Sequence, residues 1–244
     1  MVKYKKIVFF ILSLWAGYGS AQYRAANWVI NKYYLTILPG GIELDSFPPG
    51  GGYLGFLAKA SIGDEQGNLL LFSNAIDVRN RNGIVIENGS NLCESIDWPE
   101  ACIPGVNGSP HIQGALIIPN PGKPNQYYLF IKDMATDIPW EQPMRVTASL
   151  IDMSYNTGLG KVLQRAVPIL NDTLSDSRMT ACKHANGRDW WLINHEYNTN
   201  RIYTHLITPD TILGPYSQYT GGGGQKLIMV DGLYSLLMEL ALQL

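Results

Sequence analysis

The chain has 244 residues, of which 46% are hydrophobic and 11% aromatic, enough apolar material for a packed core. The chain has eighteen basic and twenty acidic residues and no basic stripe, so its charge argues against a nucleic-acid partner, and none is predicted. Twenty-five glycines and fourteen prolines indicate many turns, as an architecture of short strands requires.

The first residues have the pattern of an export signal. Lysines at positions 3, 5 and 6 precede an apolar run over residues 7–16, and small residues lead up to Ala21. A membrane anchor is the alternative, but ten apolar residues span only about 15 Å, half of a bilayer core. We therefore expect residues 1–21 to be a signal peptide, read by the export machinery and cleaved after Ala21. The mature chain would have no membrane span and would be secreted or held on the outer cell surface.

The chain after the signal carries a repeat of about 60 residues. Three times, a polar turn is followed by an apolar or aromatic run, and these runs begin at Leu69, Tyr127 and Trp190. Each turn is also preceded by a strand-like run. Two strands joined by a tight turn at a regular interval predict a repeated β-hairpin. The turns occupy residues 64–68, 123–126 and 185–189, and the preceding runs occupy residues 57–62, 113–118 and 179–184.

Two further candidate strands follow each hairpin, which makes four antiparallel strands per unit, the plan of a β-propeller blade. A β-sandwich is the rival, but it needs no internal period. We predict an all-β protein with about three WD40-like blades of an incomplete propeller over residues 22–224. The blades are expected at about residues 57–110, 111–170 and 178–220, with the additional strands at 76–79, 84–86, 145–153, 162–169, 201–208 and 216–219.

The last residues do not complete the predicted ring. Residues 225–230 are typical of the first strand of a further blade, whereas residues 232–244 are Leu-rich and helix-like. We interpret 225–244 as the start of a further blade or an aberrant C-terminus, from a truncated or frameshifted gene. A short amphipathic helix that covers the open edge is the alternative. Three blades are too few to close a ring, because closed propellers have four to eight blades.

Several motifs together resemble one family. The most specific is TACKHANGRDWW at residues 180–191, supported by DEQGNLLLF at 64–72, NRNG at 80–83, ALIIPNPG at 115–122 and YYLF at 127–130. This combination resembles the propeller region of exported Bacteroidetes proteins, which often carry a C-terminal domain used by the type IX secretion system or associated with gliding motility. The resemblance implies secretion or cell-surface display, and it assigns no activity to particular residues. The sorting domain is not found in this sequence.

Two cysteines form a candidate disulfide. Cys93 and Cys102 flank a short segment that contains Trp98 and Pro99. In an oxidising compartment a bond between them would close a small loop and stabilise it by roughly 2–3 kcal/mol. Two free thiols are the alternative.

A polar group surrounds the turn at Asn186 and Gly187. One interpretation is a cluster on one propeller face that grips a ligand. The favoured one is a type I′ hairpin turn, which suits Asn-Gly, with Asp189 satisfying local backbone donors. The residues of this candidate cluster are Lys183, His184, Arg188 and Asp189.

The sequence contains no catalytic signature. No GxSxG, Walker or CxxC motif occurs, and the four histidines, at 111, 184, 195 and 205, lack the HxH or HxxxH spacing of many metal sites. We therefore predict no catalytic residue, metal or cofactor, and a secreted or cell-surface module that binds protein or glycan. The alternative is an exported hydrolase or lyase acting on polysaccharide in the propeller channel, with His184 and Asp189 as its candidates.

Overall fold

The fold consists of antiparallel β-sheets. The computed structural model describes residues 23–30, 33–38, 40–48, 58–93, 109, 111, 113–133 and 143–221. Apart from two short 3-10 turns, η1 (Tyr23–Ala25) and η2 (Tyr155–Gly158), every regular element in these ranges is a strand. The predicted all-β class is therefore confirmed. The predicted signal peptide, Cys102 and residues 225–244 lie outside the described residues.

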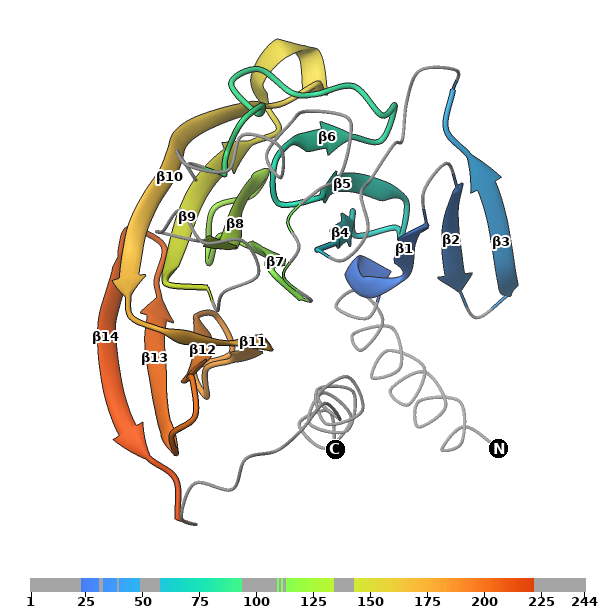
Figure 1. The fold of residues 1–244 in the computed structure, drawn as a ribbon. Coiled ribbons are helices and arrows are strands. Elements are labelled where there is room, and N and C mark those ends of the chain that lie inside the picture. Colours follow the sequence, from blue (N-terminus) through green and yellow to red (C-terminus); the bar gives the residue numbers. More distant parts are fainter. Residues whose placement is uncertain are drawn as a thin grey trace, which may run out of the picture.

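The strands form four separate sheets, each a meander in which strands adjacent in sequence are hydrogen-bonded (Figure 1). Sheet A contains β1 (Asn27–Ile30), β2 (Tyr33–Leu38) and β3 (Gly41–Ser46), and sheet B contains β4 (Ala60–Gly63), β5 (Leu69–Ser73) and β6 (Val78–Asn80). Sheet C contains β7 (Ala115–Pro119), β8 (Gln126–Asp133), β9 (Arg145–Asp152) and β10 (Lys161–Asn171). Sheet D contains β11 (Leu174–Lys183), β12 (Trp190–Glu196), β13 (Arg201–Ile207) and β14 (Ile212–Tyr219).

Sheets C and D agree with the second and third predicted units, including the four strands of each. Sheet B agrees with the first unit only in part. The predicted strand at 84–86 follows β6, with Ile86 N–H donating to the Val78 carbonyl at 3.1 Å, but it contributes a single bridge, between Arg79 and Val85, and no regular strand.

Sheet A corrects the predicted count, because the described residues form four sheets where the sequence predicts three units. The repeat was recognised by the hairpin that joins the first and second strands of a unit. In sheet A the described turn at Gly40 and Gly41 is followed by the alternating sequence of β3 and not by an apolar run, so the repeat cannot be recognised there. β3 could have been predicted in another way. Apolar and polar residues alternate along it after the Gly40–Gly41 turn, a pattern that is typical of a strand.

Neighbouring sheets share one orientation, with their first strands side by side: β4 contacts β7, and β7 contacts β11. At the start of β11, the Ser175 carbonyl accepts a hydrogen bond from Lys132 at the end of β8. At the opposite end, Arg24 bonds both Glu65, in the turn after β4, and Tyr127, at the start of β8. We call the side where β4, β7 and β11 begin the entry face, and the opposite side the turn face.

The same turn geometry recurs along the chain. The Asp64 carboxylate accepts the backbone N–H groups of Gln66 and Asn68 at 3.0 and 2.9 Å, and Gly67 donates to the Asp64 carbonyl at 3.1 Å. Asn80 makes the equivalent bonds in the turn that ends at Gly83. In each case the side chain organises the turn, and a glycine with positive φ, 88° and 76°, completes it.

The turn after β11 is a variant of this design. His184 takes the place of Asp64, since its Nδ1 accepts the Asn186 N–H at 3.1 Å. Gly187 has a φ of 72°, whereas Asn186 is not among the residues with positive φ. The predicted type I′ turn is therefore wrong, because that type requires positive φ at both central residues.

The core consists of apolar layers between neighbouring sheets. Residues along each strand alternate between the two faces, so adjacent aromatics separate: Tyr127 packs between sheets B and C, and Tyr128 between sheets C and D. Sheets A and B meet at Val29, Phe47 and Phe72. The B–C layer also includes Leu71, Ile117, Leu129, Ile131 and Ile151, and the C–D layer includes Phe130, Val146, Leu174, Leu192 and Ile207.

The turn geometry yields a first prediction. Gly187→Ala is expected to destabilise the protein by about 1–2 kcal/mol, the cost of a left-handed conformation for a residue with a Cβ atom. No steric clash adds to this cost, because an added Cβ would meet no atom within 4 Å. Urea unfolding followed by circular dichroism measures this loss. Gly221→Ala is the control, since its site is equally open but lacks the positive φ. Equal stability of the two variants would contradict the backbone explanation.

Candidate binding surface on the entry face

The predicted turn cluster is assembled as one unit on the turn face. The Arg188 guanidinium donates to both carboxylate oxygens of Asp189, at 2.7 and 3.0 Å. Asn186 donates its side-chain amide to Asp189 Oδ2 at 2.7 Å. Lys183 Nζ donates to the Arg188 carbonyl at 3.1 Å and lies 4.1 Å from the Trp190 ring centre. These side chains satisfy one another, which favours a structural role over a ligand-gripping one.

Protonation equilibria agree with this structural role. The hydrogen bonds from Arg188 lower the pKa of Asp189 to about 2. Burial of the carboxylate opposes this shift, and the hydrogen bond from the Asn186 amide adds to it. Burial lowers the pKa of Lys183. The backbone N–H of His184 donates to the Asp189 carbonyl at 2.9 Å, but the His184 ring accepts the Asn186 N–H and packs 5.5 Å from the Trp191 ring, while the Asp189 carboxylate is held by Arg188 and Asn186. The pair proposed for a hydrolase is therefore not assembled as an acid–base couple in the described residues.

The backbone donors of this turn have a different acceptor from the one predicted. Asn186 Oδ1 accepts the N–H groups of Arg188 and Asp189, at 3.0 and 2.9 Å. The assignment of that task to the Asp189 carboxylate is therefore wrong. Its oxygens are occupied by the side chains of Arg188 and Asn186 instead, which is possible because the turn brings both donors in front of it.

A bulge in β11 shapes the entry face. Leu174 pairs with Glu196 and Met179 pairs with Asn194, so the four residues 175–178 lie opposite the single residue His195 of the partner strand β12. Within this bulge Ser177 has a φ of 61°, a conformation that is uncommon for a residue other than glycine. Bulges redirect side chains and are frequent next to functional sites. Here the bulge presents the polar segment Ser-Asp-Ser-Arg.

Polar side chains from three further segments meet the bulge. His111, which precedes β7 and is 4% exposed, places Nδ1 at 3.5 Å from Asp176 Oδ1. Lys132, fully buried at the end of β8, donates to the Ser175 carbonyl at 2.5 Å. Ser175 Oγ lies 3.5 Å from Nδ1 of His195, near the end of β12. We call these five residues the entry-face cluster.

The Ser175–His195 contact lacks the geometry of a nucleophile and its base. His195 Nδ1 lies 2.6 Å from the Glu196 carbonyl oxygen. This nitrogen therefore carries the ring hydrogen and donates a hydrogen bond to that oxygen. It then has no lone pair for the Ser175 hydroxyl, which itself donates to the same carbonyl at 3.2 Å. An activated serine requires a base that can accept its proton. The arrangement supports a positioning role for both side chains.

His111 has the opposite arrangement. Its Nδ1 faces Asp176, and its Nε2 is buried without a hydrogen-bond partner in the structure. A carboxylate at Nδ1 leaves a lone pair at Nε2, the orientation of a general base. However, Nε2 is also closed off from solvent, so a substrate would reach it only after the surrounding residues moved.

The accessible part of this region combines charge, hydrogen-bonding groups and an aromatic ring. Asp176, Arg178 and His195 are half-buried. Tyr197 is 41% exposed in the turn after β12, and its N–H donates to the Thr173 carbonyl just before β11. The entry face of sheet D therefore offers an acceptor, donors and a ring within one short stretch of two neighbouring strands.

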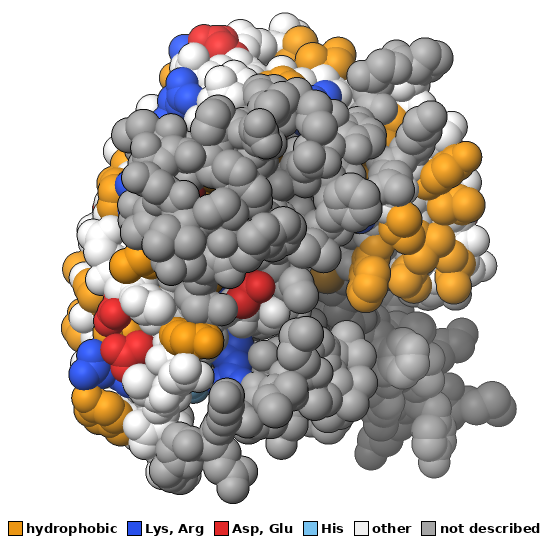
Figure 2. All heavy atoms as spheres, in the orientation of Figure 1, with side chains coloured by type: hydrophobic (Ala, Val, Ile, Leu, Met, Phe, Trp, Pro, Cys, Tyr) orange, Lys and Arg blue, Asp and Glu red, His pale blue; other side chains and the backbone are white. Residues whose placement is uncertain are grey.

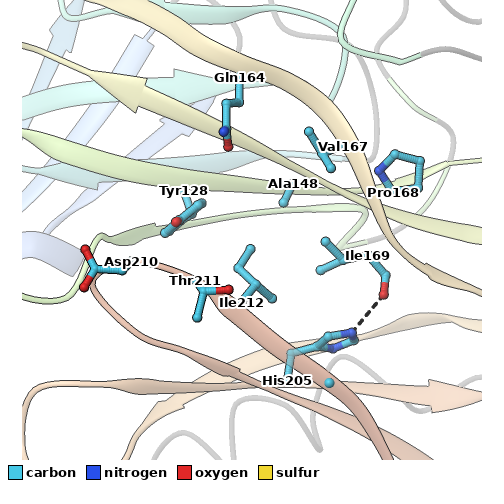
Figure 3. A pocket seen from close by; sticks show the side chains of 11 residues that line it. Tyr128, Ala148, Gln164, Val167, Pro168, Ile169, His205, Asp210, Thr211 and Ile212 are labelled. Atoms are coloured by element: carbon cyan, nitrogen blue, oxygen red, sulfur yellow. Dashed lines mark hydrogen bonds between the residues drawn. The ribbon is translucent and has the colours of Figure 1, made fainter.

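A separate pocket of about 430 Å³ lies between the outer strands of sheets C and D (Figure 3). Both β10 and β14 are irregular where they line it, with register shifts on either side of Gln164 and between Thr204 and Leu206. His205 is 1% exposed and its Nε2 bonds the Ile169 carbonyl at 3.1 Å. Burial lowers the pKa of His205, so the ring is neutral at pH 7 and Nε2 is the donor.

This pocket is a groove lined by both polar and apolar groups. Its polar contributors include the side chains of Gln164 and Thr211, and Asp210 at its mouth is paired with Lys123 at 2.9 Å. The free nitrogen of His205, Nδ1, is enclosed by protein atoms and does not open into the pocket. The apolar lining comes from Tyr128, Ala148, Val167, Pro168, Ile169 and Ile212.

The histidines do not form a metal site in the described residues, where no group of three or more His, Cys, Asp or Glu side chains converges. His195 and His205 lie on neighbouring strands, but their partners across the sheet, Ile202 and Leu192, place them on opposite faces. Cys93 Sγ lies 3.3 Å from Asp133 Oδ1. Because Cys102 is outside the described residues, the disulfide between the two cysteines stays a prediction.

Comparison with known protein families, with curated proteins and with solved structures found no match to this chain. Within the described residues, no helix is long and apolar enough to cross a membrane.

The shifted pKa of Asp189 yields a second prediction. A carboxylate whose pKa falls from 3.8 to about 2 on folding stabilises the protein above pH 4, and this contribution is lost as the pH falls through about 2. Asp189→Asn is expected to lower the melting temperature at pH 7, with a difference that shrinks from pH 4 to pH 2 and disappears below pH 2. Thermal unfolding at several pH values measures this. Asp210→Asn, which removes an exposed carboxylate on the same face, is the control.

A deficit of the Asp189→Asn variant that stayed constant from pH 7 to pH 2 would contradict the assigned role of the Arg188–Asp189 pair.

Proposed function

We propose that this chain is part of an exported β-propeller whose entry face binds glycan without chemical turnover. The observation that carries the proposal is the bulge in β11, which holds the half-buried Asp176 and Arg178 opposite His195, two residues before the exposed Tyr197. The propeller, the export and the ligand are each argued separately below.

The propeller is supported by the order of the sheets. The first strands β4, β7 and β11 contact one another in sequence, and each sheet continues outward from them as a meander. This is the radial plan of propeller blades around a central axis. The described sheets form an open arc (Figure 1), so the closed ring is part of the proposal.

Export and surface display are supported by the sequence. The basic and apolar pattern before Ala21 is typical of a signal peptide, and the motifs at residues 64–72 and 180–191 resemble those of exported Bacteroidetes propellers. In such a setting the ligand is extracellular, and polymers of the cell envelope or of the surroundings are the available glycans.

The glycan is supported by the chemistry of the entry face. A sugar ring presents hydroxyl groups, which donate and accept hydrogen bonds, and C–H faces that pack on an aromatic ring. Asp176 supplies an acceptor for hydroxyl groups, Arg178 supplies donors, and Tyr197 supplies an exposed ring with a polar tip. A protein partner is the second possible ligand, and the binding experiment distinguishes the two.

A hydrolase or lyase is the alternative function, favoured by one observation. The His111–Asp176 pair has the orientation of a general base, and propellers host catalytic sites as well as binding sites. Against it, Nε2 of His111 is closed off from solvent. The alternative replaces the proposed function if purified protein releases reducing ends from a polysaccharide and His111→Asn abolishes that release.

The proposal yields a third prediction. On an immobilised panel of bacterial and plant polysaccharides, the mature chain is expected to bind a subset, and Tyr197→Ala to weaken that binding about tenfold, or about 1.4 kcal/mol. Tyr155→Ala is the matched control, because Tyr155 is exposed to a similar extent, 45% against 41%, but lies on the turn face. Equal effects of the two substitutions, or binding of proteins alone, would contradict the glycan site.

A further inference from the structure

The groove between sheets C and D is formed where both outer strands depart from regular pairing. In β10, residues 165–166 lie opposite the single residue Ser149 of β9. In β14, residues 214–215 lie opposite the single residue His205 of β13. The two irregular strands are joined across the sheets, because His205 Nε2 donates to the Ile169 carbonyl at 3.1 Å. Bulges of this kind are frequent next to functional sites, and here one in each sheet borders the same hollow.

Three polar side chains that line the groove have no hydrogen-bond partner within the part of the chain that the structure describes. They are the hydroxyl of Tyr128, the amide of Gln164 and the hydroxyl of Thr211, which surround one opening (Figure 3). Burial raises the pKa of Tyr128, so its hydroxyl keeps its hydrogen at pH 7. All three groups both donate and accept hydrogen bonds. Unlike the members of the turn cluster, they leave this capacity to a ligand.

The lining of the groove is electrically neutral. Among the described residues that line it, Asp210 is charged, and its carboxylate lies 2.9 Å from Lys123 Nζ. His205 is uncharged at pH 7, because burial lowers its pKa. The other lining residues carry no charge. Neither an anion nor a cation would therefore find an unpaired countercharge, which favours a neutral ligand.

One end of the groove is apolar. Val167, Pro168 and Ile169 of β10 lie together on the right in Figure 3, whereas Tyr128 and Asp210 lie on the left. Val167 is 46% exposed, so its side chain is within reach of a bound molecule. A ligand that matches both ends has a part that donates and accepts hydrogen bonds and a short apolar part.

The surface around β10 and β14 is mixed in character. Figure 2 shows hydrophobic and charged side chains interspersed with other atoms along this side of the molecule, on the left. Protein interaction sites are often marked by contiguous apolar patches. The mixed surface agrees better with a small ligand held in the groove than with a protein partner that covers it.

We propose that the groove binds one neutral sugar ring that carries an acetamido group, as N-acetylhexosamines do. The acetamido N–H and C=O match the amide of Gln164 and the hydroxyls of Tyr128 and Thr211, and its methyl group matches the apolar end at Val167. Small-molecule sites have volumes of about 300–1,000 Å³. The groove, at about 430 Å³, lies near the lower end of this range, which suits a compact ligand.

An extended peptide is the rival occupant, because outer strands can pair with an added strand. At the start of β10, however, the loop after β6 already occupies the outer edge. The Val162 N–H donates to the Glu87 carbonyl at 2.8 Å, and Arg165 donates to the carbonyls of Ser90 and Asn91 at 2.9 and 3.2 Å. The irregular backbone beyond this point interrupts the regular spacing that a strand ladder requires. These contacts favour the compact ligand.

The fourth prediction concerns the ligand. Saturation-transfer NMR on the mature chain is expected to detect binding of N-acetylglucosamine or N-acetylgalactosamine. Glucose and galactose, which lack the acetamido group, and glucosamine, which carries an ammonium group instead, are expected to bind at least tenfold more weakly. Failure of both acetamido sugars to bind, equal binding of the other three sugars, or binding of peptides in their place would overturn the proposal.

Substitutions place this binding in the groove. Val167→Trp is expected to abolish it, because the indole would fill the space that the ligand needs. Leu163→Trp is the matched control, since Leu163 lies on the same strand and is 38% exposed but does not line the groove. Tyr128→Phe is expected to weaken binding about tenfold, whereas Tyr216→Phe, which removes a hydroxyl outside the groove, is expected to have no effect. Controls that weaken binding as much as the groove variants would overturn the proposal, and circular dichroism verifies that each variant is folded.

This site is separate from the one in the proposed function, because no residue of the entry-face cluster lines the groove. Tyr197→Ala is expected to leave binding of the acetamido sugar unchanged, and Val167→Trp to leave the Tyr197-dependent binding of polysaccharides unchanged. Either proposal can therefore fail without the other.

Discussion

The structure depends on packing between sheets that are apolar on both faces. A strand alternates its side chains between two sides, so in β8 Tyr127, Leu129 and Ile131 fill one layer while Tyr128 and Phe130 fill the next. No single sheet can bury both of its sides, because each layer needs residues from two sheets. The same requirement explains the core between sheets B and C.

This packing also determines where polar chemistry can occur. With both sides of each sheet committed to apolar layers, hydrogen-bonding side chains collect at strand ends, on the entry face and the turn face. On the turn face they satisfy one another, as Arg188 and Asp189 do. On the entry face the bulge in β11 breaks the pairing with β12, and the side chains of Asp176 and Arg178 are half-buried there.

The sequence predicted those features that are encoded locally. The hairpin turns at Asp64 and His184 and the strands beside them can be recognised because turn residues and apolar runs are contiguous. Sheet A was missed because, among the described residues, no polar turn followed by an apolar run precedes or divides its strands. The entry-face cluster was missed because His111, Lys132 and His195 come from distant segments, and no spacing in the sequence shows that the sheets bring them together.

Whether the residues of a cluster are neighbours in the sequence or come from distant segments also affects whether the cluster can bind a ligand. The turn cluster was visible in the sequence because its members are neighbours, and for the same reason they reach and neutralise one another. A binding surface requires side chains that a ligand can reach, and backbone irregularity is one way to redirect them. Ser177, with its positive φ, lies in such an irregular segment, between the half-buried side chains of Asp176 and Arg178.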